Sequence, residues 1–317
     1  DICDSIIANG DPHWKTNQKF DINEFPVDHI DIIEPSPGVA VSLKLYGGRL
    51  NAPKLQDLPI EPSASIRPDE RNDLRLYCRN DLATTAMLYK AIKNEVDIRA
   101  DMSEQYGIDL RSKSGAQVAK AVIGHQLKEI GVKVKTQKIK EGTTYRYKMP
   151  DFINFASEQL NELKDLIIKS KFVVNDKGSV LIPDELKKVI KFDGAKYKIG
   201  IGGLHSQEKK QAIVCGENQV FGEFDYASMY PFIILNQNLY PSHLGKRFLT
   251  MYKDIVDRRI AAKKLGDKAT SESLKLVINS SFGLFGNKYS FLYSPDLLIQ
   301  TTITGQLCLL MLIEKVV

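Results

Sequence analysis

Asp225 is a carboxylate in a mostly apolar stretch, FGEFDYASMYPF, at residues 221–232. The stretch alternates like a β-strand as far as Asp225 and then takes on a helical pattern. A carboxylate at the end of a core strand is a suitable ligand for a divalent metal ion. Aspartate is also a residue type that caps a following helix. The stretch alone leaves metal ligand and helix cap equally open.

Two helices predicted further along the chain carry basic and amide side chains at helical spacing. Arg259 and Lys263 are four residues apart and therefore share one helical face. Lys275, Asn279 and Phe282 follow the i, i+4, i+7 spacing and share a face of the second helix. A hairpin of these helices would present cations that suit a triphosphate with its metal ion. A plain solvated face is the alternative interpretation.

The rest of the sequence predicts the elements that must position these residues. Helical periodicity predicts helices over 69–96, 114–130 (with Ser114 as N-cap), 151–170, 229–238, 249–265, 271–284 and 297–317. Alternation and turn residues predict a strand-like run at 29–33, a β-hairpin over 132–149 and two short strands within 171–182. Helices and strands mix without a βαβ rhythm, so the predicted fold class is α+β.

The bulk composition narrows the class of protein. The 317 residues are 43% hydrophobic and 26% charged, which is typical of a soluble, well-packed protein of about two domains. No apolar run approaches ~18 residues, so no membrane span is predicted. The four scattered cysteines favour a reducing cytoplasm and suggest neither a zinc site nor a disulfide framework.

Basic residues are concentrated in two stretches. Residues 187–210 carry seven lysines against Asp193 and Glu208, and residues 132–148 alternate basic and apolar side chains. The formal net charge of the chain is +5. A solvated surface explains one such stretch, but two of them favour contact with a phosphate backbone.

Two of these stretches resemble motifs of family B DNA polymerases. DYASMYP at 225–231 resembles motif A, D-x-x-S-L-Y-P, and KLVINSSFG at 275–283 resembles motif B, K-x-x-x-N-S-x-Y-G. The order of the motifs, their spacing and the intervening R-x-x-x-K also fit. The glycine cluster GIGGLHS at 200–206 lies where phage members, especially protein-primed ones, carry Y-x-G-G. The chain is similar to a bacteriophage replicative polymerase.

The resemblance implies a role for each matching residue. Asp225 would bind both catalytic metal ions, two Mg²⁺ with Mn²⁺ as the alternative, helped by the backbone carbonyl of Tyr226. Tyr230 would pack under the incoming sugar and exclude a 2′-hydroxyl, and Lys275 would also protonate the departing pyrophosphate. The remaining implied contacts are Arg259, Lys263, Lys275 and Asn279 to the triphosphate, Phe282 and Gly283 to the nascent base pair, and Gly202 and Gly203 to the template.

Tyr77 and Asp81, in YCRNDLATT, resemble the third exonuclease motif, Y-x-x-x-D. They lie one helical turn apart and so face one way. The resemblance to DEDD-type 3′–5′ exonucleases implies that Tyr77 orients the attacking water and that Asp81 holds a metal ion. A core position for Tyr77 beside Leu74 and Cys78 is the alternative.

The sequence departs from the family pattern at several positions. Phe282 replaces the tyrosine of motif B, Met229 replaces the leucine of motif A, and Gly200 stands at the tyrosine position of Y-x-G-G. Phe282 can stack on the nascent pair but cannot donate a hydrogen bond. The substitution at Gly200 leaves a template role for the glycine cluster open.

Carboxylates are missing where the family needs them. The chain contains neither a D-x-D, which the third polymerase motif carries, nor a D-x-E, which the first exonuclease motif requires. Two-metal catalysis needs at least two carboxylates. We therefore expect a central fragment of a longer polymerase, with D-T-D after Val317 and D-x-E before Asp1. We expect no polymerase or nuclease activity from the 317 residues themselves.

The resemblance thus implies template-directed DNA synthesis with 3′–5′ proofreading in phage replication. The expected parts are the C-terminal portion of an RNase H-like exonuclease domain at 1–98, a connecting region at 99–215, part of the palm at 216–248, an α-helical fingers hairpin at 249–288 and the start of a palm helix at 289–317. The expected partners are a DNA primer–template and dNTPs, in the host cytoplasm and without a membrane. Priming from a terminal protein or from an oligonucleotide is left open. A non-catalytic nucleic-acid-binding remnant of a polymerase is the alternative function.

Overall fold

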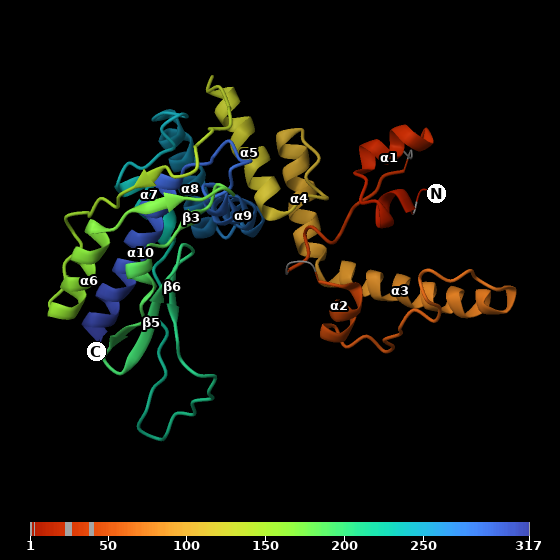
Figure 1. Cartoon of the computed structure of the whole chain (residues 1–317), viewed down its shortest axis with the longest axis horizontal. Helices are drawn as coiled ribbons and strands as arrows, with labels where there is room; N and C mark the ends of the chain where they lie inside the picture. The colour runs from red at the N-terminus through yellow and green to blue at the C-terminus, as the bar shows by residue number, and fades with distance from the viewer. Residues whose placement is uncertain (1, 3, 23–26, 38–40, 317) are drawn as a thin grey trace. The chain divides into compact units, whose positions relative to one another are not determined.

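The computed structural model of the protein describes residue 2 and residues 4–22, 27–37 and 41–316. These residues form helices and two small antiparallel sheets, so the predicted α+β class is confirmed. The chain divides into two compact units, Asp1–Asp31 and Ile32–Val317, and each is described by itself (Figure 1). The domain boundaries expected from the sequence remain predictions.

The first unit contains a short π-helix, η1 (Asp4–Ala8), and the helix α1 (His13–Phe20). Asp11 connects the two, because its carboxylate accepts hydrogen bonds from Lys15 Nζ at 2.5 Å and from Ser5 Oγ at 2.8 Å. These two bonds lower the pKa of Asp11. The unit is therefore held together locally by polar contacts.

The second unit begins with helices, listed as α2 (Leu43–Arg49), η2 (Pro68–Glu70), α3 (Arg71–Ala91) and α4 (Lys93–Tyr106). The single helix predicted over 69–96 is wrong, because Ile92 leaves the helical conformation at φ −104° and ψ 17°. Ile92 is buried there, so packing outweighs local helix propensity. The strand-like run at 29–33 forms no strand, and no described residue before Thr144 is in a sheet. The RNase H-like assignment of 1–98 therefore remains a prediction.

The helix α5 (Gly115–Glu129) confirms the prediction made for 114–130. Ser114 Oγ accepts from Gln117 N at 3.4 Å, and Ser114 N donates to Gln117 Oε1 at 2.9 Å. This reciprocal pair is a capping box, which satisfies two backbone donors at the start of a helix. A Cβ at Gly115 would lie 2.5 Å from Ser280 Oγ, so glycine allows α5 to approach α9 (Lys268–Leu284) closely.

The first sheet has the order β1-β2-β3, with β1 (Thr144–Tyr145), β2 (Phe172–Val174) and β3 (Val180–Leu181). β2 and β3 form the pair of strands predicted within 171–182. The hairpin predicted over 132–149 is wrong, because Thr144 and Tyr145 pair with β2 instead. Val174 N donates to Thr143 O at 3.0 Å, so β2 occupies the backbone groups that residues 132–140 would need.

The second sheet has the order β4-β5-β6, with β4 (Ile190–Phe192), β5 (Ala195–Ile199) and β6 (Leu204–Ser206). Asp193 and Gly194 both have positive φ, 43° and 75°, which suits the tight turn between β4 and β5. Ile199 is buried whereas Lys196 and Lys198 are exposed. The basic stretch therefore forms a sheet that presents its lysines to solvent.

The helix α6 (Glu158–Lys169) is shorter than the helix predicted over 151–170. Ile153 and Phe155 are both buried with an exposed residue between them, so residues 151–157 follow the core in a non-helical conformation. Glu314, near the end of α10 (Pro295–Val316), bonds the residues just before α6. Its carboxylate accepts from Ser157 N at 2.8 Å, Ser157 Oγ at 2.6 Å and Ala156 N at 2.9 Å.

These bonds predict a pH-dependent contribution of Glu314 to stability. Burial acts to raise the pKa of the Glu314 carboxyl, but the hydrogen bonds from Ser157 and Ala156 outweigh it and hold the pKa below its ordinary 4.5. A depressed folded-state pKa stabilises the fold above the unfolded-state value and loses that effect as the pH falls through the folded-state value. We expect Glu314→Gln to lower the melting temperature at neutral pH, and the deficit to vanish in acid. Glu162→Gln, at an exposed position of α6, is the control. An equal deficit at both pH values would contradict the assignment.

The strand predicted up to Asp225 is not formed. Residues 207–228 contain no strand, and Val220, Phe221 and Phe224 are 96%, 74% and 71% exposed. A strand needs a neighbour for its backbone hydrogen bonds. Beyond Gln207, whose N donates to Lys196 O at 2.8 Å, no described strand pairs with this stretch. The alternation of apolar residues is therefore present in the sequence, but it does not produce a strand.

The predicted hairpin of basic helices is confirmed by α8 (Arg247–Leu265) and α9 (Lys268–Leu284), which follow α7 (Met229–Asn236). Gly266 ends α8 at φ 75°, and Asp267 Oδ1 accepts from Thr270 N at 3.1 Å to cap α9. Tyr252 of α8 is buried against α9, and this burial raises its pKa to about 12. Packed side chains between α8 and α9 therefore hold the two helices of the hairpin together.

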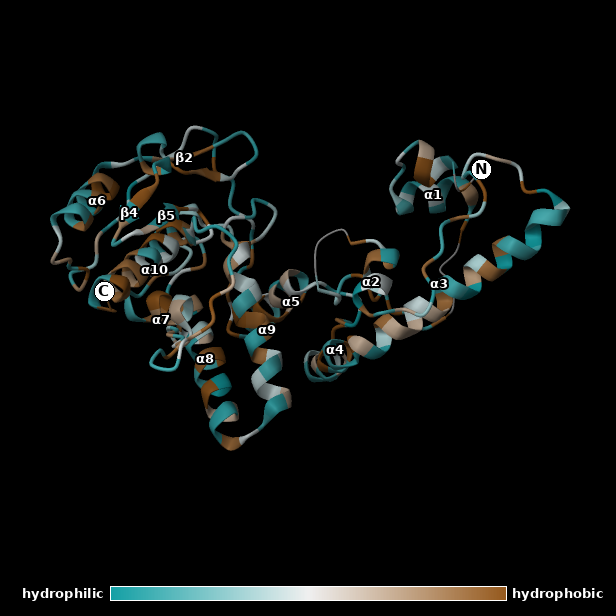
Figure 2. Ribbon diagram, turned by 90° about the horizontal axis from the view of Figure 1, so that it is seen from below, coloured by the Kyte–Doolittle hydropathy of each residue, from teal (hydrophilic) through white to brown (hydrophobic). Residues whose placement is uncertain are grey.

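The helix α10 confirms the buried helix predicted at 297–317, as far as residue 316. By length and composition it could cross a membrane, although no uninterrupted apolar run reaches ~18 residues. Within the fold, 61% of the most apolar 18-residue segment of α10 is buried. Figure 2 shows this largely brown helix among the elements of the second unit. Thr304 Oγ1 and Tyr147 Oη lie 2.8 Å apart, so its polar side chains are also used internally. We describe α10 as a core helix.

Candidate nucleotide-binding site

Tyr230 brings motif A, motif B and the glycine cluster together. Its ring centroid lies 4.4 Å from that of Phe282 on α9, with the planes tilted by 36°. Its hydroxyl donates to Gly202 O at 3.1 Å. On α10, a Cβ at Gly305 would lie only 2.7 Å from Tyr230 Cε1, so the ring rests against the backbone of α10. Four segments far apart in sequence therefore fix this one ring.

Arg259 is held beside the same segment. Its Nη1 donates to Ser228 Oγ at 2.9 Å, which connects α8 to the start of α7. Its Nε is buried and has no hydrogen-bond partner among the described residues. A buried donor without an acceptor is costly, of order 1–3 kcal/mol, and calls for an explanation such as a ligand. An anionic oxygen would satisfy this donor.

Ser228 rather than Asp225 stands at the N-cap of α7. It has a left-handed conformation at φ 51° and ψ 44°, and it makes no side-chain capping bond. Such a conformation is unfavourable for a residue with a Cβ and tends to occur at functional sites. The alternative interpretation of Asp225 as a helix cap is therefore wrong. The Ser228 hydroxyl is used instead to hold Arg259.

The metal site expected at Asp225 is not formed by the described residues. Asp225 is exposed, and no group of three or more His, Cys, Asp or Glu side chains that could hold a metal ion occurs in the described part of the chain. Tyr226 directs its hydroxyl to Cys308 O at 3.2 Å, and burial raises its pKa. A two-metal centre needs more carboxylates than the described residues gather here, so they do not fit that centre. We assign no step to a metal ion.

The other predicted triphosphate contacts lie on the hairpin. Lys275 Nζ is 3.0 Å from Glu272 on its own helix, so its charge is partly balanced. Lys263 and Asn279 are exposed. Gly283 is exposed, and a Cβ there would meet nothing within 4 Å. A flat partner can therefore approach this end of α9.

A cavity of about 460 Å³ adjoins the Tyr230 ring system. It is lined by Phe282 and Gly283 of motif B together with Gly202, Lys177, Lys288 and Tyr289. Gly202 is thus next to the site as predicted, and Gly203 lies near it because its Cβ would be 3.6 Å from Tyr230 Oη. Two lysines and an exposed tyrosine ring suit phosphate and base contacts.

Tyr77 and Asp81 do meet on α3. A hydrogen bond joins them, and burial first and this bond second raise the pKa of Tyr77. Lys44 forms an ion pair with Asp57, and the charges of both residues act on Tyr77. Tyr77 thus belongs to a polar cluster, which speaks against the alternative of an apolar core position. A metal role for Asp81 remains a prediction.

Several residues of these sites were missed in the sequence. Ser228 is part of motif A, but nothing in the pattern predicts its left-handed backbone. Gly305 occurs in an apolar helix, where a glycine is the available signal for close approach. Lys44 and Asp57 carry no motif, so their meeting with Tyr77 could not be foreseen.

Comparisons of the chain with protein families, with curated proteins and with solved structures found no match in any of the three. Inference about function therefore depends on the residues and their geometry.

Proposed function

We propose that the chain binds a nucleoside triphosphate and a primer–template as the nucleotide-handling part of a family B-like DNA polymerase. The observation that carries the proposal is that Tyr230 contacts Phe282 and the Gly202 carbonyl, while Arg259 bonds Ser228 two residues before Tyr230. Motif and spacing alone point to Tyr230, Phe282, Arg259 and Gly202. A chance resemblance of short motifs gives no reason for these contacts.

Each group has a chemical use in this proposal. The stacked rings of Tyr230 and Phe282 form a flat apolar platform for a sugar and a base. Arg259 offers its unpartnered Nε to a phosphate oxygen, and Lys275 and Lys263 add charge along the hairpin. Positioning and charge neutralisation are what phosphoryl transfer requires of a protein. The catalytic carboxylates of the family pattern would have to join this part, as would its Mg²⁺ ions.

The finer fold assignment belongs to the same proposal. Residues 216–248 and 249–288 would correspond to palm and fingers, and 1–98 to the exonuclease portion with Tyr77 and Asp81. The α8–α9 hairpin supports the fingers part. The localisation in a host cytoplasm and the phage source follow from the same resemblance.

A non-catalytic nucleic-acid-binding remnant is the competing function. It accounts for the exposed lysines of the second sheet, but it gives no role to the unpartnered Arg259 Nε. The two functions differ in triphosphate binding. A polymerase part binds dNTPs by their phosphates, whereas a remnant binds polynucleotide alone.

The test is a titration of the chain with a fluorescent dATP analogue, followed by competition. We expect saturable binding, with unlabelled dATP competing better than dADP and dADP better than dAMP, because the hairpin cations hold the terminal phosphates. We also expect no primer extension with Mg²⁺, since the described carboxylates are too few. Equal competition by the three nucleotides, or no binding, would favour the remnant.

A further inference from the structure

A basic groove runs along α5, outside the Tyr230 site. Two cavities of about 460 and 440 Å³ share Lys128 and Val134, and so form one continuous depression. We call it the α5 groove. Its basic rim consists of Lys113, Lys120, Lys128, Lys133 and Lys135. Its apolar floor consists of Ile108, Ala121, Gly124, Val134 and Phe291.

The positive charge of the rim is not neutralised by ion pairs with described residues. None of the five rim lysines forms an ion pair with a described residue. The neighbouring carboxylate of Glu129 lies 3.6 Å from His125 Nδ1 instead. Five uncompensated cations along one groove favour a polyanion. They extend from the turn before α5 through α5 to the segment after it, which suits a row of phosphates better than one compact anion.

The floor of the α5 groove is apolar. A Cβ at Gly124 would lie 3.2 Å from Phe291 Cε1, so the glycine leaves the Phe291 ring in direct contact with the helix backbone. A duplex turns its phosphates outward and keeps its bases stacked inside, so it cannot use such a floor. A single strand offers both phosphates and unpaired bases.

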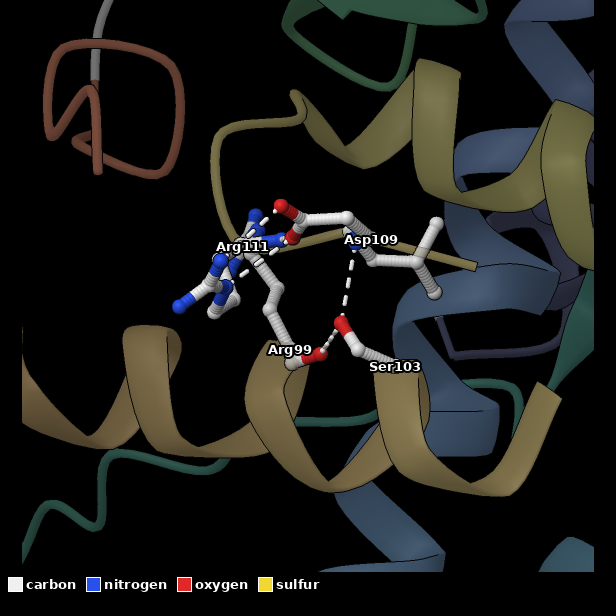
Figure 3. A network of polar contacts seen from close by, with 5 residues as sticks. Arg99, Ser103, Asp109 and Arg111 are labelled. Carbon is white, nitrogen blue, oxygen red and sulfur yellow. Dashed lines mark hydrogen bonds and ion pairs between the residues drawn. The ribbon is translucent and has the colours of Figure 1, made fainter. Parts of the chain in front are cut away.

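The rim is held in place by the turn that precedes α5. Arg99 Nε donates to Lys113 O at 2.8 Å. Ser103 Oγ donates to Arg99 O at 2.6 Å and accepts from Leu110 N at 2.9 Å (Figure 3). Asp109 and Arg111, drawn in the same view, form an ion pair at 3.0 Å. Hydrogen bonds therefore fix the backbone at the Lys113 end of the groove.

The groove is connected to the proposed nucleotide site. Lys120 Nζ donates to Tyr289 O at 3.2 Å, and Tyr289 also lines the cavity beside Phe282 and Gly283. Phe291, two residues further on, lies in the floor of the groove. A strand that leaves the cavity at Tyr289 therefore meets the rim at Lys120.

We propose that the α5 groove binds single-stranded polynucleotide, and specifically the unpaired template ahead of the primer terminus. The assignment to template rests on the proposed function, whereas the preference for a single strand rests on the groove alone. The rim lysines bind the phosphates, and the apolar floor contacts the bases. Neither motif A nor motif B reaches this surface.

The test compares primer–templates whose 5′ template overhang is one nucleotide or about 12 nucleotides long, by fluorescence anisotropy with the whole chain. We expect the long overhang to bind at least about tenfold more tightly. The variant Lys113→Glu/Lys128→Glu/Lys135→Glu loses this gain, and the slope of log K against log salt falls by about 2. Lys120 is left unchanged because it also bonds Tyr289. The control Lys54→Glu/Lys90→Glu/Lys169→Glu reverses three other exposed lysines and keeps the gain.

Three outcomes would contradict the proposal that the α5 groove binds a single strand. The wild-type chain could show no gain from the long overhang, the groove variant could keep the gain, or the control could lose as much as the groove variant. Competition by dATP is measured on the same variants and reports on the Tyr230 site separately. A groove variant that binds triphosphate normally without the overhang gain supports both proposals. A wild-type chain that binds no triphosphate but shows the overhang gain removes only the proposed function.

Discussion

Replacing Arg259 with alanine is expected to weaken triphosphate binding by about one to two orders of magnitude, because a hydrogen bond to a charged group contributes about 1.5–3 kcal/mol. Arg259 Nη1 is anchored to Ser228 Oγ at 2.9 Å, and its buried Nε has no partner among the described residues. The side chain is thus oriented before the ligand arrives. Equilibrium titration with a fluorescent dATP analogue measures the loss.

Arg258→Ala is the matched control. Arg258 is the residue before Arg259 in α8, and its Nη1 lies 3.5 Å from Asp254, so it already has a partner. Removing it changes the net charge equally but leaves the Tyr230 site intact. We expect Arg258→Ala to leave nucleotide affinity unchanged, and Ser228→Ala to weaken it less than Arg259→Ala does. If the two arginine variants lose the same affinity, the loss comes from the change in net charge, and Arg259 does not contact the triphosphate specifically.

Local signals predicted a large part of the fold correctly. The Ser114 capping box, the α8–α9 hairpin and the buried α10 each follow from residues close together in sequence. The wrong strand predictions depend on pairing between distant segments. Thr144 finds its partner in β2, and the stretch before Asp225 finds no strand partner among the described residues.

The site was predicted in its residue types but not in its contacts. Motif and spacing pointed to Tyr230, Arg259 and Phe282, and the structure brings Tyr230 to Phe282 and Arg259 to Ser228. The left-handed Ser228 and the role of Gly305 depend on the approach of α7 to α8 and α10, which no local pattern encodes. Of the α5 groove, the sequence indicates only the basic stretch at 132–148, because the other lysines are spread over the turn before α5 and over α5 itself. For part of that basic stretch the sequence predicts a hairpin, which the structure does not form.

Gly305→Ala is expected to destabilise the fold, against the usual effect of alanine in a helix. Alanine is favoured over glycine by about 1 kcal/mol in a helix interior. At this position its Cβ would lie 2.7 Å from Tyr230 Cε1. The ring cannot move cheaply, because its hydroxyl is bonded to Gly202 O and its face rests on Phe282. Overpacking of this kind costs about 1–3 kcal/mol. Gly283→Ala on α9, where a Cβ meets nothing within 4 Å, is the matched control and should stabilise.

A double-mutant cycle with Tyr230→Ala decides whether the ring is the cause. In that background the space beside Gly305 is open, so Gly305→Ala should become stabilising and the coupling free energy should be about 2 kcal/mol. Urea unfolding of the four proteins measures it. If Gly305→Ala costs the same with and without the ring, α10 is sensitive there for another reason. If the coupling appears, Gly305→Ala shifts the Tyr230 ring from its place against Phe282. We then expect Gly305→Ala also to reduce the preference for dATP over ATP, because in the proposed function the ring under the sugar makes that choice.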